Sequence, residues 1–182
     1  MFAADVYSAD QWNNFFVVAG TGSAALTGLV FVGISVNLRD VLKDATHTYR
    51  AINMLNGFTS VFILGCFALM GHQTHQSLGL EWLIVALVAG AINTNGYIHG
   101  FSLTGSRYAL SLFRIAGGSA CYLGQIIGGA ALLLGAGWGV YLAATALIVN
   151  FAFLVSGSWL LIVGTLQNSH ASPVEGSRHT SA

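Results

Sequence analysis

Five long apolar stretches, separated by short polar segments, run through the chain. A helix needs about 20 mainly apolar residues to cross a hydrocarbon core of about 30 Å. The pattern therefore predicts an all-α, polytopic membrane bundle of five transmembrane helices. We place the spans at 15–37, 51–70, 80–98, 115–136 and 140–164, between an interfacial lead-in at 1–14 and a disordered tail at 167–182.

The last two spans share one apolar stretch that is too long for a single crossing. A cluster of glycines, Gly135, Gly137 and Gly139, interrupts this stretch. Glycines grouped in this way are typical of a tight turn between helices. We therefore expect the chain to reverse its direction within the cluster.

Basic residues predict the orientation of the bundle. With five spans and the N-terminus outside, all six basic residues fall on the cytoplasmic side: Arg39, Lys43, Arg50, Arg107, Arg114 and Arg178. The outer segments carry only acidic charge, from Asp5, Asp10 and Glu81. Because cytoplasmic loops concentrate Lys and Arg, this distribution predicts an outer N-terminus and an inner C-terminus.

Tryptophans fit the same orientation. Trp12, Trp82 and Trp138 fall near the outer ends of the predicted spans. Amphipathic rings favour the headgroup level of a bilayer. We therefore expect these three side chains to lie at the outer membrane–water interface.

Composition narrows the class of protein. Hydrophobic residues make up 55% of the chain and charged residues only 7%, whereas soluble domains carry about 25% charged residues. So little charge does not keep a folded protein dispersed in water. The composition excludes a soluble enzyme, a nucleic-acid-binding protein and a disordered chain, and the first partner that it predicts is the lipid bilayer.

Small residues recur every four positions in two of the predicted spans. Membrane helices associate through such flat faces, because lipid supplies no hydrophobic force between them. Two interpretations stay open: packing within the protomer, or a subunit interface in a homo-oligomer, chiefly through the fourth span. The residues are Gly20, Ala24 and Gly28 in the first span, and Ala116, Ala120, Gly124 and Gly128 in the fourth.

Two amides are expected near the middle of the bilayer. Gln125 and Asn150 lie 12 and 13 residues either side of Gly137, so an antiparallel hairpin brings them to a similar depth. Neither side chain reaches water alone, and burying an unpaired amide is costly. We predict a hydrogen bond or a shared polar pocket between them. The alternative is that each amide bonds a backbone carbonyl of its own.

A second polar layer is predicted nearer the cytoplasmic side. It has two interpretations: hydrogen bonds that hold helices together, or the lining of an inward-facing vestibule. Its members are Asn53, Asn56 and Ser60 in the second span, and Asn93, Thr94 and Asn95 in the third.

Histidines suggest two candidate metal sites. His72 and His75 form an H-x-x-H pattern in the outer loop, and Glu81 follows. Two imidazoles on one helical turn, together with a carboxylate, can bind a metal ion, and the alternative is a solvated loop. His47 and His99 lie in separate inner loops and are a further candidate, for a haem with two histidine ligands.

Ionisable residues are missing from the span centres, which contain no Asp, Glu, Lys or Arg. Proton relays, ion-coupled carriers and voltage sensors usually need buried ionisable groups, so the pattern argues against active transport. The sequence also contains no nucleophile–base pair, phosphate loop or paired carboxylates. We therefore assign no catalytic residue.

The first span and its lead-in read WNNFFVVAGTGSAALTGLVFV from Trp12 to Val32. This segment resembles the opening of a group of small, uncharacterised bacterial multi-span proteins with an Ala-Ala-Leu-x-Gly-Leu-x-Phe-Val core. The resemblance implies a multi-pass protein of the bacterial plasma (inner) membrane, and it brings no catalytic or binding residues with it.

Three classes of function follow from these observations. The first is a non-catalytic accessory subunit, assembly factor or modulator that acts through helix packing in a membrane complex or a homo-oligomer. The second is a passive oligomeric channel for ions or small solutes, lined by the two polar layers. The third is a metal-binding membrane protein that uses the outer-loop histidines.

Overall fold

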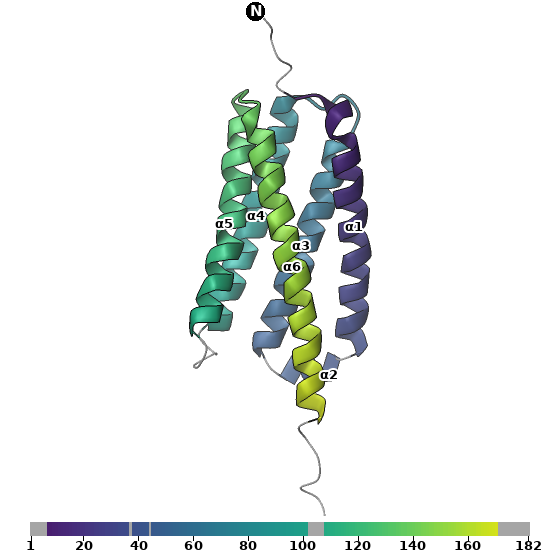
Figure 1. Ribbon diagram of the computed structural model, residues 1–182, viewed down its shortest axis with the longest axis vertical. Coiled ribbons are helices and arrows are strands. Elements are labelled where there is room, and N and C mark those ends of the chain that lie inside the picture. The colour runs from purple at the N-terminus through teal and green to yellow at the C-terminus, as the bar shows by residue number, and fades with distance from the viewer. Residues whose placement is uncertain (1–6, 37, 44, 102–107, 171–182) are drawn as a thin grey trace, which may run out of the picture.

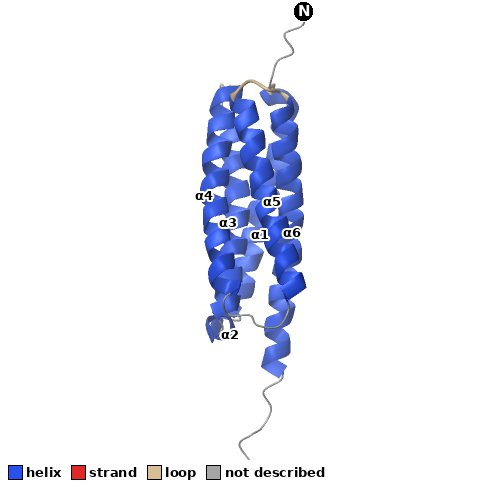
Figure 2. Ribbon diagram, turned by 90° about the vertical axis from the view of Figure 1, so that its left-hand side faces the viewer, coloured by secondary structure: helices blue, strands red, loops and turns tan. Residues whose placement is uncertain are grey.

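The computed structural model describes residues 7–36, 38–43, 45–101 and 108–170. In these ranges the chain is all-α (Figures 1 and 2). Five of the described helices are long and apolar enough to cross a membrane, which confirms the predicted all-α class and the predicted number of membrane-length helices. The helices are α1 (Ala9–Val36), α2 (Leu38–Lys43), α3 (Ala45–Ala68), α4 (His75–Phe101), α5 (Tyr108–Leu133) and α6 (Trp138–His170).

The five long helices run side by side, each antiparallel to the one before it (Figure 1). We call the end of the bundle where α1 begins the upper end, and the end where α6 finishes the lower end. The α3–α4 and α5–α6 turns lie at the upper end, and α2 lies at the lower end. Helix α3 packs against α1, α4 and α6, while α5 lies between α4 and α6. The four helices α3 to α6 therefore surround one interior, and α1 is attached mainly through α3.

The turn between the last two spans needs a glycine. Helix α5 ends at Leu133 and α6 begins at Trp138. Between them Gly135 has a φ of 83°, in the left-handed region that side chains with a Cβ rarely adopt. The helices extend past several of the predicted span ends, because hydrogen bonding along a helix continues beyond the apolar stretch that the bilayer requires.

Helix α1 meets α3 at one pair of glycines. A Cβ at Gly65 would lie 3.0 Å from the Cα of Gly20. The next two small residues of the predicted stripe, Ala24 and Gly28, are exposed, and a Cβ at Gly28 would meet nothing within 4 Å. The face that α1 turns to the bundle instead carries Phe16, Gly20, Ser23 and Val30, at the three- and four-residue spacing of a helix.

Helix α5 uses glycines on two faces. Gly124 and Gly128 face α6, where a Cβ at Gly128 would lie 2.6 Å from the backbone nitrogen of Ala143. On another face, Gly129 packs against the α4 backbone near Leu83. The upper half of the predicted stripe therefore packs within the protomer. Its lower half, Ala116 and Ala120, is exposed.

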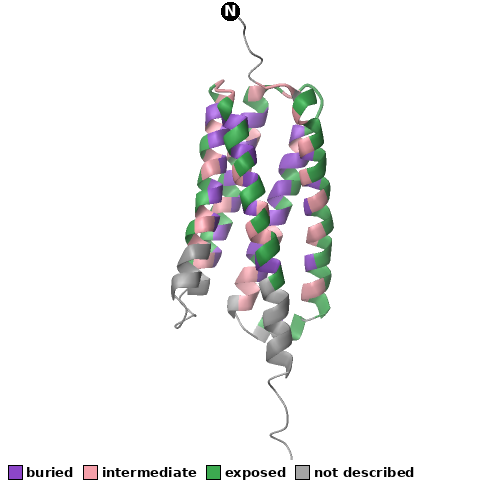
Figure 3. Ribbon diagram, viewed as in Figure 1, coloured by how far each residue is buried: buried purple, intermediate pink, exposed green. Residues whose placement is uncertain are grey.

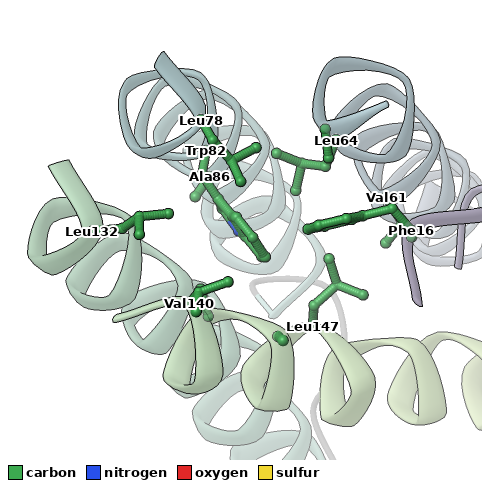
Figure 4. Close-up of a cluster of buried hydrophobic side chains, with 12 residues drawn as sticks. Phe16, Val61, Leu64, Leu78, Trp82, Ala86, Leu132, Val140 and Leu147 are labelled. Carbon is green, nitrogen blue, oxygen red and sulfur yellow. The ribbon is translucent and has the colours of Figure 1, made fainter. Parts of the chain in front are cut away.

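All five long helices contribute to a cluster of buried apolar side chains in the upper part of the bundle, which we call the upper apolar cluster (Figure 4). The Trp82 ring is 0% exposed within it, and the ring centroids of Phe16 and Trp82 are 5.8 Å apart. The Trp82 ring therefore faces the interior of the bundle rather than the lipid headgroups. The cluster comprises Phe16, Val61, Leu64, Ala68, Leu78, Trp82, Ala86, Leu132, Val140, Ala143, Ala144 and Leu147.

Burial is uneven around the bundle (Figure 3). Large apolar side chains such as Leu29 and Phe31 on α1 and Leu123 on α5 are exposed on its outer surface. An exposed apolar surface of this extent is typical of a protein that lipid or other apolar partners cover. The short α2 sits at the lower end, where Val41 is buried against Ala51 and Met54.

Candidate functional site: a polar core between four helices

Below the upper apolar cluster, polar side chains join apolar ones such as Phe58 in the interior. Six polar side chains, each at most 8% exposed, belong to the inner faces of α3, α4, α5 and α6. Placing so many polar groups inside a membrane bundle is costly unless they are hydrogen-bonded or functional. We call this group the polar core. It consists of Asn53 and Ser60 on α3, Asn93 on α4, Tyr122 and Gln125 on α5, and Asn150 on α6.

Asparagines of α3 join the lower part of the core to α4. The Asn53 amide nitrogen donates to the backbone oxygen of Asn93 at 3.3 Å. One turn higher, the Asn56 amide nitrogen donates to the backbone oxygen of Ala89 at 3.0 Å. These bonds fix the register of the two helices, so that the amides of Asn53 and Asn93 lie at the same level.

Glycines make room for these polar side chains. Gly96 on α4 lies directly against the Asn53 amide, so that a Cβ there would overlap it. A Cβ at Gly118 on α5 would lie 2.9 Å from the Tyr97 hydroxyl and 3.5 Å from the Asn93 amide nitrogen. Because glycine lacks the Cβ, α4 and α5 approach closely enough to enclose the amides.

The middle of the core is built around a tyrosine. Tyr122 packs against Gly90, where a Cβ would lie 3.3 Å from the Tyr122 Cβ and 3.5 Å from the first carbon of its ring. Its hydroxyl lies beside the side chains of Asn150 and Ser60, but it makes no hydrogen bond of good geometry. The Ser60 hydroxyl instead donates to the backbone oxygen of Gly57 at 2.7 Å. Three helices thus bring polar groups to one depth.

Several atoms of the core have no hydrogen-bond partner in the protein. They are the Tyr122 hydroxyl and the amide nitrogens of Asn93, Gln125 and Asn150, together with the Asn53 amide oxygen. Buried polar groups are almost always hydrogen-bonded, and unpaired ones point to a bound water, a ligand or a functional role. The core is therefore a candidate site for a bound water or another small polar molecule.

No direct hydrogen bond joins Gln125 to Asn150. Such a bond needs one of the two amide nitrogens as donor, and neither has a partner. The register of the hairpin is the reason. Gly124 lies against Ala146, so the neighbouring Gln125 faces the same turn of α6. Asn150 lies about one helical turn below that turn, nearer the lower end of the bundle. The turn is centred near Gly135 rather than Gly137, which produces this offset.

The other predicted members of the lower polar layer take different places. Asn56 is half-buried and bonded to α4, as described above. Thr94 and Asn95 lie on the exposed side of α4, and the Thr94 hydroxyl donates to the backbone oxygen of Gly90 at 2.8 Å. They are therefore separate from the core, although Asn93 stands directly before them in sequence.

The predicted outer-loop metal ligands are not brought together. Within the described ranges, no three His, Cys, Asp or Glu side chains are close enough to hold a metal ion. The Glu81 carboxylate accepts a hydrogen bond from the Gln73 amide at 2.9 Å, while His72 is exposed in the turn with a φ of 62°. For the haem candidate, the His47 side chain is half-buried on α3, and that of His99 lies outside the described side chains.

Sequence reasoning missed two residues of the interior. Tyr122 is the centre of the core, and the Trp82 indole nitrogen is a further buried donor with no partner, about one turn above Gln125. The position of Tyr122 was a usable signal, because a tyrosine in the middle of a span is far from the headgroups that its hydroxyl favours.

Comparisons with known proteins found no match: no family model, no curated protein and no solved structure is similar to this chain.

The Asn56–Ala89 bond gives a first prediction. Asn56→Leu is expected to lower the free energy of unfolding by about 1 kcal/mol, because interhelical hydrogen bonds in membrane proteins contribute about 0.6 kcal/mol and at most about 1.7 kcal/mol. Unfolding in mixed micelles measures the change. Asn95→Leu, an equal substitution on an exposed position, serves as the control and is expected to leave stability unchanged.

Proposed function

We propose that this protein is a non-catalytic membrane protein that gives water and small uncharged polar solutes a passive route through each five-helix protomer. The observation that supports the proposal is the polar core itself. Its side chains follow one another down the interior of α3 to α6, and five of its polar atoms have no partner in the protein. Along α5 alone, the core extends from Gln125 to the level of Gly118, about 10 Å at the rise of a helix.

The chemistry of the core favours neutral solutes. Its six side chains are amides, hydroxyls and a phenol, and none of them carries charge at neutral pH. An ion that left water for such an environment would meet no opposite charge, and the cost of its desolvation would stay uncompensated. We therefore expect water and small neutral solutes to pass, and ions to be excluded.

The route belongs to the protomer and not to an oligomer interface. The residues expected to line an oligomeric pore, Gln125, Asn150, Asn53 and Asn93, are all buried inside the four-helix interior. We place the upper end outside the cell and the lower end in the cytoplasm of a bacterium, following the distribution of basic residues. In this arrangement the upper apolar cluster closes the route on its outer side.

Flux measurements test the proposal. Proteoliposomes are expected to exchange water and acetamide faster than protein-free vesicles, at an unchanged ion permeability. Asn93→Leu is expected to reduce the added flux severalfold, whereas the exposed Asn95→Leu is its matched control and leaves the flux unchanged. Phe16→Ala, which removes a ring from the upper apolar cluster, is expected to raise the flux. If all four proteins leave the vesicles as tight as lipid alone, the conduit does not exist.

The flux is also expected to be insensitive to pH. The amides and Ser60 do not titrate, and phenols ordinarily ionise near pH 10. Outside the spans, burial raises the pKa of Tyr7 further above its usual value, so this phenol also stays neutral in the physiological range. Acetamide flux is therefore expected to change by less than about twofold between pH 5 and pH 8. A steep change of acetamide flux with pH in this range would indicate that a histidine controls the route instead.

A second candidate function follows from α1. This helix is attached mainly through α3, and the exposed Ala24 and Gly28 leave a small-residue face outside the bundle. Such faces pack closely against other membrane helices. On this alternative, the protein is an accessory subunit, assembly factor or modulator. Crosslinking from Ala24→Cys in native membranes distinguishes the two cases, because an accessory subunit gives a defined adduct with another protein or a second copy, and a lone conduit gives none.

A further inference from the structure

We propose that Tyr7 is a removable cap on the upper end of the bundle, which moves between a closed position on the upper apolar cluster and an open position in water. As a gate for solutes, the cap rests on the proposed function, because it controls the outer side of the route. The movement of the cap does not depend on that function, and the two are tested separately.

Tyr7 lies in the short segment before α1, and this segment crosses the upper end of the bundle (Figures 1 and 2). Its side chain is half-buried and packs against the upper apolar cluster. Because Tyr7 precedes the first residue of α1, the hydrogen bonds of the helix do not fix its backbone. The ring is therefore held in place mainly by its own packing.

The cluster under the cap is dry up to the end of the bundle. Leu78 lies in the first turn of α4 and is 0% exposed, with Trp82 and Phe16 beside it in the same cluster (Figure 4). A side chain so close to the end of a bundle stays dry only when other groups cover it. Among the described half-buried apolar side chains that pack against the cluster, Tyr7 is the one that lies outside a helix. It is therefore the part of this cover that moves most easily.

The hydroxyl of Tyr7 opposes the closed position. It is buried and has no hydrogen-bond partner among the described residues, and burial raises the pKa of this phenol. A buried hydroxyl without a partner carries a cost of desolvation, whereas burial of the aromatic ring is favourable. These two effects oppose each other, and the hydroxyl recovers its hydrogen bonds to water when the cap opens. The closed position is therefore only weakly favoured.

Helix α1 is attached to the bundle by other contacts, so the cap opens without displacing the helix. The ring centroids of Trp12 on α1 and Tyr141 on α6 are 5.0 Å apart, in an edge-to-face arrangement. Further down, Gly20 of α1 lies against Gly65 of α3. Neither contact involves Tyr7. Opening therefore requires a change only in the segment before α1.

Labelling of a thiol under the cap tests the inference. Leu78→Cys, in a full-length chain that also carries Cys66→Ala and Cys121→Ala, places a single thiol in the cluster. A water-soluble methanethiosulfonate reagent is expected to label this thiol about tenfold faster when Tyr7→Ala removes the ring. Trp138→Ala is the matched control, since it removes an exposed ring that lies outside the cluster, and it is expected to leave the rate unchanged.

The sign of the effect of Tyr7→Phe separates a cap from a structural anchor. This variant keeps the ring and removes only the buried hydroxyl, so the closed position gains and labelling is expected to be about fivefold slower than in the parent. Faster labelling would mean that the hydroxyl anchors the segment through a hydrogen bond. An unchanged rate would mean that the ring does not cover the cluster. Either result would overturn the cap.

Flux through vesicles separates the cap from the conduit. If the cap is the outer gate, acetamide flux is expected to rise with Tyr7→Ala and to fall with Tyr7→Phe. If labelling follows the expected order but vesicles show no added flux, the cap stands and the conduit fails. Added flux that is equal in the two variants leaves the conduit in place and contradicts the cap as its gate.

Discussion

Replacing Gly128 with valine is expected to destabilise the bundle by about 3 kcal/mol or more. A Cβ at this position would lie 2.6 Å from the backbone nitrogen of Ala143, 2.7 Å from its Cβ and 2.7 Å from the backbone oxygen of Gly139. Backbone atoms do not move aside as the end of a flexible side chain does. The hairpin of α5 and α6 must therefore open, and Leu132 and Val140 lose their packing with it.

The control for this prediction lies in the other predicted stripe. Gly28 is also a helical glycine with small neighbours at four-residue spacing, but a Cβ there would meet nothing within 4 Å. Gly28→Val is therefore expected to change stability by less than about 0.5 kcal/mol. Unfolding of both variants in mixed micelles measures the difference. Equal losses in the two variants would mean that glycine acts only through helix flexibility, and that the close contact of α5 with α6 is incorrect.

The double substitution Gln125→Leu and Asn150→Leu is expected to lower solute flux about tenfold without loss of stability. The two amide nitrogens are buried with no partner, so each carries a desolvation cost that leucine removes. The protein is therefore expected to unfold at the same or a higher denaturant concentration. The flux falls because the middle of the route no longer offers hydrogen bonds to a passing solute.

These two readouts separate a functional role from a structural one. If the amides only hold helices together, the double variant loses stability and its flux stays unchanged once the amount of folded protein is matched. The control is Thr94→Val with Asn95→Leu, which makes two comparable changes on the exposed side of α4. It is expected to alter neither stability nor flux.

Periodicity and charge were sufficient to predict the frame of this protein. Five apolar stretches of bilayer length become five long helices, and the division of the last stretch falls at Gly135, where a positive φ requires glycine. These features are local, since each depends on the residues of one segment. The glycine spacing was less informative, because Gly124 and Gly128 pack inside the bundle while Ala24 and Gly28, with the same spacing, face outward.

The polar core was predicted only in outline. Counting residues from Gly137 placed Gln125 and Asn150 at one level, and a turn centred near Gly135 offsets them by about one helical turn. The sequence carries no local signal for this offset, which depends on how α5 and α6 interlock. The same limit hid Tyr122, whose hydroxyl meets Asn150 and Ser60 only because three helices converge.

Water contact with the core amides in a lipid bilayer is the most direct measurement of the central claim. Water-edited solid-state NMR transfers magnetisation from mobile water to nearby protons, and the side-chain amides of Gln125 and Asn150 are resolvable after selective labelling. The backbone amides of Ala143 and Leu147, in the upper apolar cluster, provide the dry reference. We predict rapid transfer from water to both side-chain amides and slow transfer to the reference. Transfer to the side-chain amides that is as slow as to Ala143 and Leu147 would show that the core is dry and that no polar solute passes through it.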